Sequence, residues 1–548
     1  MRAFEGRRVA VLALSPLAFL VYFFFQSKYA LIASTAIFVA MVVYGLVIPL
    51  SRIKFPSSNV DLDLVYALLH MLSVSTGKPP VSYIFKSVSE EGLYPVYREI
   101  FRKIYVLGKE WGYSFADACR LVARTVNNKI VREILARLGS VLAVGEDVEQ
   151  FLRLEYSTIM SEFETQHSRS TDALRIVLGV YSSLLAAATF MIASLVVLAF
   201  FFGDIGERLI VSSFTAVTIM ILAAAATIGV AIPTTPFENK LKPYPRLYGI
   251  IDVLAPVMLA CSAAISYLLL RKMGLSITSI ALGLGATGAL LLVPGYAAKS
   301  IERLVNDVDL FFPVFIRSYG MHLQTLPQMD RALKPILVAE LGKLNKTLEN
   351  LYARLSNNID PFISWRLFSA ETRSELVARS VRIFLDTFER GGRLADVGAL
   401  LSDTHNTIVR LRKARLEVGK TFESAISLMH ALIALIVVFV SRLAEFLSSV
   451  LVGLQAAIPT DAAVLFFFQM LPRELLTLPI ALMLIASVLS TSLVASKAIP
   501  GVSRSFWYYV SVLAIFTTAG AIAGDQMVGF IVARVVGPLA NVIGDIVP

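Results

Sequence analysis

The sequence has few of the residues from which covalent or metal-bound sites are built. Its 548 residues include only two cysteines and five histidines. Cys119 and Cys261 stand far apart without the spacing of a metal site, and no two histidines lie four positions apart. The sequence therefore gives no basis for a disulfide framework or a zinc site, and we expect neither a metal nor a cofactor.

Motifs of nucleotide hydrolysis and acyl transfer are also missing. The chain contains no GxxxxGK[ST], no HExxH and no GxSxG pattern. A GxGxxG pattern does occur at 283–288, but it lies inside an apolar segment and does not follow a strand. Small residues in that setting favour close packing of membrane helices over a nucleotide site. We therefore predict that the chain is not an enzyme.

Charged residues are scarce and unevenly distributed. They make up 16% of the chain, whereas soluble domains average about 25%. Apolar runs alternate with polar blocks, and a run of about 20 apolar residues is long enough to cross a bilayer. We predict about nine spans, at 9–26, 29–50, 174–202, 209–233, 249–270, 275–299, 424–441, 475–496 and 506–524.

Lysine and arginine residues flank these spans mainly on one side. Cytoplasmic loops are enriched in such residues, so the pattern predicts a cytoplasmic N-terminus and an outside C-terminus. Arg271 and Lys272 are the exception. The net charge of +10 suits this arrangement and does not call for a nucleic-acid partner. The residues that set the orientation are Arg2, Arg7, Arg8, Arg52, Lys54, Lys240, Lys242, Arg246, Lys299, Arg303, Lys497 and Arg504.

The fold class that follows is an all-α, polytopic membrane protein with two duplicated helical-bundle domains in the cytoplasm. The helical period of the two long polar stretches indicates that both are helical. We divide the chain into a two-span anchor, a first helical domain, a four-span region, a second helical domain and a three-span region. Their bounds are 1–50, 51–173, 174–299, 300–423 and 424–548.

Short matches between the polar stretches predict the duplication. Asp61-Leu62-Asp63-Leu64 has a counterpart in Asp307-Val308-Asp309-Leu310. Gly145-Glu146-Asp147 has a looser counterpart that begins at Gly392. In each stretch a long polar helix then enters a span. The two copies have the same orientation, which differs from the inverted repeats of transporters.

Helix-start signals in the first stretch lead to a family resemblance. Ser114 and Asp117 form a capping box behind Gly112, and the acidic residues Glu146 and Asp147 follow Gly145 at the start of a long helix. This segment resembles the F domain of type II secretion systems. The second stretch departs from the pattern, with Asn358-Ile359-Asp360-Pro361-Phe362 in place of Gly-x-Ser-Phe.

Two such domains with about nine spans resemble the archaeal branch of this family, the membrane platform of archaella and type IV pili. The resemblance implies a non-enzymatic protein of the cell membrane. Its expected partners are a hexameric secretion ATPase, pilin or archaellin subunits, the lipid bilayer and a second copy in a homodimer. Whether the filament is an archaellum or an adhesive pilus stays open. The alternative is a multi-pass transporter with cytoplasmic regulatory domains.

Basic residues before the seventh span allow two interpretations. Arg410, Arg412, Lys413 and Arg415 could hold the span at the cytoplasmic face by contact with lipid headgroups. They could instead form a docking surface for an acidic partner. Further along the chain, His430 and Asp525 lie near span ends, where we expect both to reach the membrane interface.

Cysteine labelling tests the predicted orientation. In a variant without Cys119 and Cys261, a single cysteine introduced at Ser89 or Ser356 is expected to stay unlabelled by a membrane-impermeant thiol reagent in intact cells. Both positions lie in the predicted cytoplasmic domains. Labelling of either position would contradict the orientation.

Overall fold

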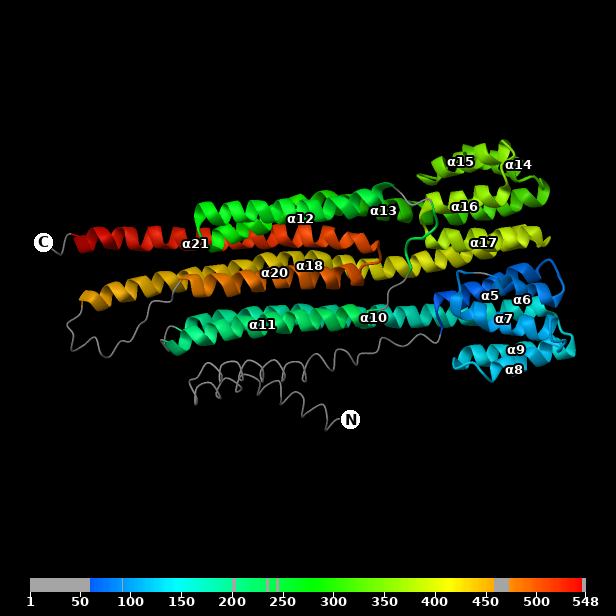
Figure 1. Cartoon of the computed structure of the whole chain (residues 1–548), viewed down its shortest axis with the longest axis horizontal. Coiled ribbons are helices and arrows are strands. Elements are labelled where there is room, and N and C mark those ends of the chain that lie inside the picture. The colour runs from blue at the N-terminus through cyan, green and yellow to red at the C-terminus, as the bar shows by residue number, and fades with distance from the viewer. Residues whose placement is uncertain are drawn as a thin grey trace.

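The computed structural model describes residues 60–90, 92–199, 204–232, 236–242, 246–457 and 473–544. Over these ranges the chain is helical, with one isolated β-bridge between Glu238 and Ser374 and no strand. The molecule is elongated, with long helices lying side by side and shorter helices gathered at one end (Figure 1). The all-α prediction is confirmed.

Seven helices of the described residues are long and apolar enough to cross a membrane. They coincide with seven of the nine predicted spans. The first two, at 9–26 and 29–50, lie outside the described residues, as do Arg2, Arg7, Arg8, Arg52 and Lys54. The seven are α10 (Val148–Ala199), α11 (Asp204–Ala231), α12 (Arg246–Met273), α13 (Ile277–Thr325), α18 (Leu394–Ala457), α20 (Arg473–Ala498) and α21 (Phe506–Gly544).

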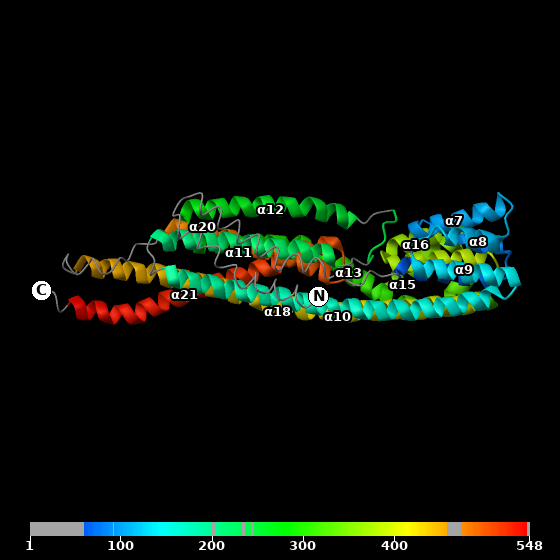
Figure 2. The ribbon, with the colours of Figure 1, turned by 90° about the horizontal axis from the view of Figure 1, so that it is seen from below.

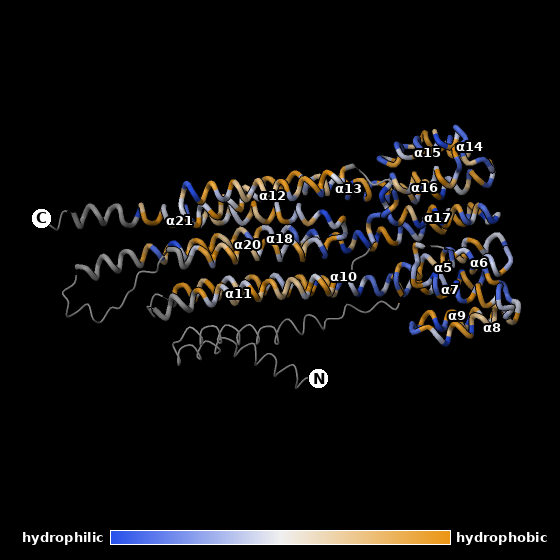
Figure 3. The backbone as a smooth tube through the Cα atoms, viewed as in Figure 1, coloured by the Kyte–Doolittle hydropathy of each residue, from blue (hydrophilic) through white to orange (hydrophobic). Residues whose placement is uncertain are grey.

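Three of these helices are much longer than a bilayer is thick. α10 has 52 residues, α13 has 49 and α18 has 64. At 1.5 Å per residue they are about 75–95 Å long, whereas the hydrocarbon core is about 30 Å thick. Each runs without interruption from the mostly apolar end of the molecule into the more polar end, where the short helices lie (Figure 3).

The short helices form two sets with the same order. Each set ends where a long helix leads into the apolar bundle. The first set is α5 (Leu62–Ser75), α6 (Val81–Ser89), α7 (Pro95–Lys109), α8 (Phe115–Ala123) and α9 (Lys129–Val144), followed by α10. The second is the polar part of α13, α14 (Met329–Leu333), η3 (Lys334–Val338), α15 (Leu344–Ser356), α16 (Pro361–Thr372) and α17 (Glu375–Glu389), followed by α18.

The turn before α8 is built from two special positions. Gly112 has φ +75°, and Ser114 caps the helix by accepting the Asp117 N–H at 3.1 Å. The Ser114 hydroxyl also donates to the Asp117 carboxylate at 2.6 Å. At the end of α9, Gly145 takes a left-handed conformation, with φ +80°. Beyond it Asp147 accepts the Glu149 N–H at 2.8 Å, and Glu146 is exposed.

The second set repeats this geometry with other residues. Asn358, with φ +55°, stands 246 positions after Gly112, and Asp360 caps α16 246 positions after Ser114. The left-handed residue that corresponds to Gly145 is Gly391, with φ +67°. The counterpart of Gly145 is therefore Gly391, one residue before the Gly392 that we expected.

The two sets pack against each other around one continuous hydrophobic core. α5, almost completely buried, contacts α17 of the second set, and α10 runs along α18. Polar contacts cross the same boundary: His70 Nε2 lies 3.0 Å from Asp386 Oδ2, and Arg379 lies 2.6 Å from Asp63. The two sets therefore form one packed unit.

Glycines of the GxGxxG pattern lie at close contacts between membrane helices. A Cβ atom added at Gly288 would come within 2.9 Å of the Ser511 carbonyl oxygen on α21, and one at Gly285 within 2.8 Å of Thr518. The close-packing interpretation is confirmed. α12, by contrast, buries only 11% of its most apolar stretch, and it lies at the edge of the bundle (Figure 2).

The two proposed labelling positions differ in their exposure to solvent. Ser89 is buried, whereas Ser356 is exposed. Ser356 is therefore the suitable position for the labelling experiment. α21 ends at the opposite end of the molecule from the short helices (Figure 1).

A matched pair of alanine substitutions tests the helix packing. Gly288→Ala is expected to lower the stability of the detergent-solubilised protein by about 1–3 kcal/mol, because the new methyl group overlaps α21. Gly179→Ala on α10 is the control, since a Cβ atom there meets nothing within 4 Å. Thermal unfolding of both variants gives the comparison. Equal stability of the two would contradict the packing described.

Candidate functional site at the base of the second helical set

A buried carboxylate holds three helices together where the second set meets the membrane bundle. Asp309 on α13 is 1% exposed, and Arg412 on α18 donates to it at 2.5 Å. The Ser374 hydroxyl at the start of α17 also donates to Asp309, and His405 Nε2 lies 3.5 Å away. Burial alone would raise the pKa of Asp309, but the Arg412 charge and the contacts of His405 and Ser374 hold it below its usual value.

The loop between α11 and α12 is fastened to the same place. Within residues 236–242, the Asn239 side chain donates to the carbonyl groups of Ser369 at 2.7 Å and Ser374 at 3.1 Å. The Asn239 N–H donates to the Arg373 carbonyl at 2.9 Å. The guanidinium carbon of Arg412 lies 4.8 Å from the ring centroid of Phe237. Arg412 therefore contacts the loop as well as Asp309.

The loop between α20 and α21 is held by a second arginine and a glutamate. Arg415 donates to the carbonyl groups of Lys497 at 2.9 Å and Ala498 at 3.2 Å. Burial lowers the pKa of Arg415 to about 10, so it keeps its charge at neutral pH. Glu302 on α13 accepts the Val502 N–H at 2.9 Å and the hydroxyl of Ser505.

We call these contacts the junction. Its members are Asp309, Ser374, His405, Arg412, the loop 236–242, Arg415, Glu302 and the loop 497–505. In the described part of the chain, the loop between α11 and α12 and the loop between α20 and α21 lie at the end of the bundle next to the short helices. Both belong to the junction. The junction therefore links the second helical set to α11, α12, α20 and α21 by direct contacts, in addition to the continuous helices α13 and α18.

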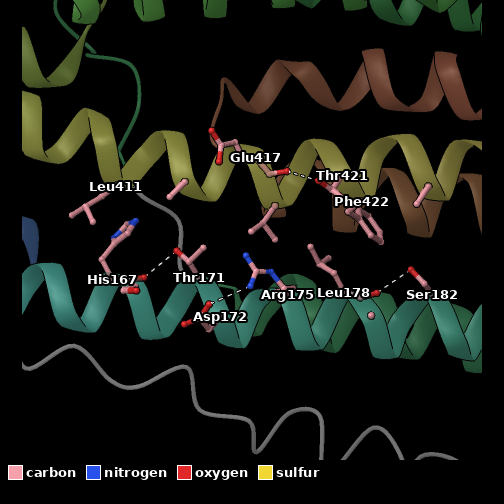
Figure 4. Close-up of a pocket in the computed structure, with 15 residues that line it drawn as sticks. His167, Thr171, Asp172, Arg175, Leu178, Ser182, Leu411, Glu417, Thr421 and Phe422 are labelled. Carbon is pink, nitrogen blue, oxygen red and sulfur yellow. Dashed lines mark hydrogen bonds and ion pairs between the residues drawn. The ribbon is translucent and has the colours of Figure 1, made fainter.

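A groove of about 630 Å³ separates α10 from α18 beside the junction (Figure 4). Its walls include the apolar side chains Leu178 and Phe422, and Arg175 lies 3.6 Å from Asp172 at its rim. Burial, together with the charges of Arg415 and Arg412, lowers the pKa of His167 to about 4, so this side chain is neutral at pH 7. The lining residues do not form an arrangement of nucleophile, base and oxyanion donors.

The four basic residues before the seventh predicted span do not form one exposed surface. This corrects the docking interpretation for two of the four. Arg412 and Arg415 are buried in the junction. Each arginine points into the protein because a buried acceptor, Asp309 or the carbonyl groups of α20, lies within reach. Arg410 and Lys413 are exposed, and Arg410 lies 2.9 Å from Glu164 on α10. A docking role remains a prediction for these two.

One of the two polar residues near span ends also differs from expectation. His430 is 1% exposed, and its Nε2 lies 3.0 Å from the Thr491 hydroxyl, so the prediction that it reaches the interface is wrong. Hydroxyl groups inside the bundle satisfy it. Asp525 pairs with Arg442 at 2.7 Å. Within the described ranges, no three His, Cys, Asp or Glu residues come together as metal ligands.

Comparison with known proteins gives a family match over the first helical set and α10. Residues 67–196, from α5 to α10, match the family described as type II secretion system (T2SS), protein F. The predicted resemblance is confirmed over these residues. No solved structure matches the chain.

Two curated relatives carry the name flagella accessory protein J. The protein of Methanocaldococcus jannaschii is 28% identical over 341 residues, which cover 57% of this chain and 57% of the relative. The protein of Methanococcus voltae is 26% identical over 340 residues, covering 57% of this chain and 58% of the relative. The chain thus spans little more than half the length of these relatives.

Neutralising Asp309 tests the junction. Asp309→Asn leaves the Arg412 guanidinium buried without its counter-charge, so we expect a loss of about 3–5 kcal/mol in unfolding free energy. Arg410→Ala removes an exposed pair and is expected to cost no more than about 1 kcal/mol. Thermal unfolding of the solubilised proteins compares them. A loss from Asp309→Asn no larger than that of the control would contradict the role of the pair.

The same pair predicts a dependence of stability on pH. Because the folded protein holds the pKa of Asp309 below that of the unfolded chain, the carboxylate contributes its full stability above about pH 4. The contribution is lost as the pH falls through the folded pKa. The difference in stability between the parent and Asp309→Asn should therefore shrink in acid.

Proposed function

We propose that this chain is a non-enzymatic membrane platform for the assembly of a type IV pilus-like filament, either an archaellum or an adhesive pilus. The match to the F family and the two archaeal flagella accessory proteins support it. The observation that carries the proposal is the continuity of α10, α13 and α18, which join the helical sets to the membrane bundle without a flexible linker.

The platform couples a cytoplasmic hexameric ATPase to the extraction of pilin or archaellin subunits. The ATPase docks on the two helical sets, which we take as duplicated cytoplasmic domains. Because they share one core, a push on either set moves both. The long helices and the junction carry that movement to the spans, and the displaced spans release subunits from the bilayer into the filament base. The chain itself makes and breaks no covalent bond.

Arg410 and Lys413 are candidates for part of the docking surface. Both are exposed on α18, and Arg410 lies beside Glu164 at the boundary between the two sets. An acidic face of the ATPase would meet this pair before it reached the membrane. In this arrangement the N-terminus is cytoplasmic and the C-terminus is outside. The platform acts as a homodimer.

Binding of the ATPase tests the coupling. The full chain in lipid nanodiscs is titrated with the purified assembly ATPase of the same organism. The double variant Arg410→Glu/Lys413→Glu is expected to bind about fivefold more weakly at low salt, with the difference fading at high salt. Arg124→Glu/Lys129→Glu, an equal charge change on the first set, is the control. If both variants and the parent bind the ATPase with equal affinity, Arg410 and Lys413 are membrane anchors and not a docking surface.

A further inference from the structure

A second cleft lies within the helical sets, away from the groove between α10 and α18. It has a volume of about 310 Å³, near the lower limit for small-ligand sites. Its walls come from α16 and α17, from the turn before α7, and from the junction loop 236–242. The lining residues are Leu93, Leu241, Phe362, Ile363, Arg366, Ser369, Ala378, Val381, Arg382 and Leu385.

The cleft follows from a difference between the two sets. In the first set, α8 and α9 touch, since a Cβ atom at Gly139 would lie 2.9 Å from the Ala116 carbonyl oxygen. The residues 246 positions later are Phe362 and Leu385, and both line the cleft. Two large side chains thus occupy the positions of an alanine and a glycine. They separate α16 from α17 where α8 and α9 pack closely.

The chemistry of the cleft is apolar with a positive rim. Phe362, Ile363, Val381 and Leu385 form its apolar walls, and Ile363 is 47% exposed. Both charged residues of the lining are arginines, and no carboxylate lines it. Arg366 is exposed, while Arg382 lies 3.6 Å from Asp386. A ligand that combines apolar groups with a carboxylate would complement both features.

The position of the cleft in the molecule favours a protein occupant over a lipid. The cleft lies among the short helices and is not lined by the seven apolar helices that could cross the membrane. Its volume holds a few side chains and not a whole helix. The carbonyl of Ser369, which lines the cleft, also accepts the Asn239 side chain of the junction. An occupant would therefore contact the segment that fastens α11 and α12.

We infer that this cleft binds a segment of the assembly ATPase in which a carboxylate stands beside two or three large apolar side chains. The inference rests on the proposed function, because it takes the ATPase as the partner. The carboxylate meets Arg366, and the apolar side chains cover Ile363 and fill the space beside Phe362. Since the junction loop 236–242 forms one wall, a bound segment acts directly on the loop that connects α11 and α12.

Two matched pairs of variants test this site, using the full chain in nanodiscs and the purified assembly ATPase as the probe. Arg366→Glu is expected to weaken binding at least tenfold, whereas Arg120→Glu, 246 positions earlier on α8, changes it less than twofold. Ile363→Ala is expected to weaken binding about fivefold. Its control is Ile359→Ala, which removes an equally exposed isoleucine that does not line the cleft. Thermal unfolding of all four variants should match the parent.

The outcomes separate this inference from the proposed function. Parent-like binding by Arg366→Glu and Ile363→Ala would overturn the site and leave the platform intact. Equal losses in Arg366→Glu and Arg120→Glu would also overturn it, because the effect would then come from net charge. Absence of any binding to the parent chain would overturn the coupling to an ATPase, and this site with it.

Discussion

The structure depends on the continuity of three helices across the boundary between the polar and apolar parts of the molecule. A helix cannot bend sharply without losing backbone hydrogen bonds, so a displacement at one end of α10, α13 or α18 reaches the other end. Even the two prolines inside α13, Pro294 and Pro313, do not divide it. The helical sets are therefore extensions of the membrane helices.

The remaining spans pack against these three helices in one buried cluster, and the junction adds direct contacts between them and the second helical set. Asp309 and Arg412 form a buried pair whose separation would leave a charge in a medium of low dielectric constant. Around this pair, Arg415 and Glu302 bind backbone carbonyl and amide groups of the loop 497–505. In the other returning loop, the Asn239 side chain binds backbone carbonyl groups of the second set. Such contacts fix the position of a loop, whereas contacts between two flexible side chains would fix only their own ends.

The sequence predicts the spans, the helix starts and the likeness between the two helical sets, because these depend on local composition and short-range hydrogen bonds. The capping arrangement of Ser114 and Asp117 is visible in four consecutive residues. The burial of Arg412 is not, since its partner Asp309 lies 103 positions away and nothing local distinguishes it from Arg410. Two local signals single out Asp309: it lies next to the apolar residues that include Phe311 and Phe312, and it belongs to the segment that matches Asp61–Leu64.

The central claim is that the second helical set and the returning membrane helices move as one body. Pulsed electron paramagnetic resonance measures this most directly, with spin labels at Ser356 and at Leu247, which lies in the first turn of α12 and is 45% exposed. Cys119 and Cys261 are replaced first. We predict a single narrow distance distribution in nanodiscs that is the same with and without the ATPase and ATP. A broad distribution, or one that changes with nucleotide, would show a hinge at the junction and contradict the account.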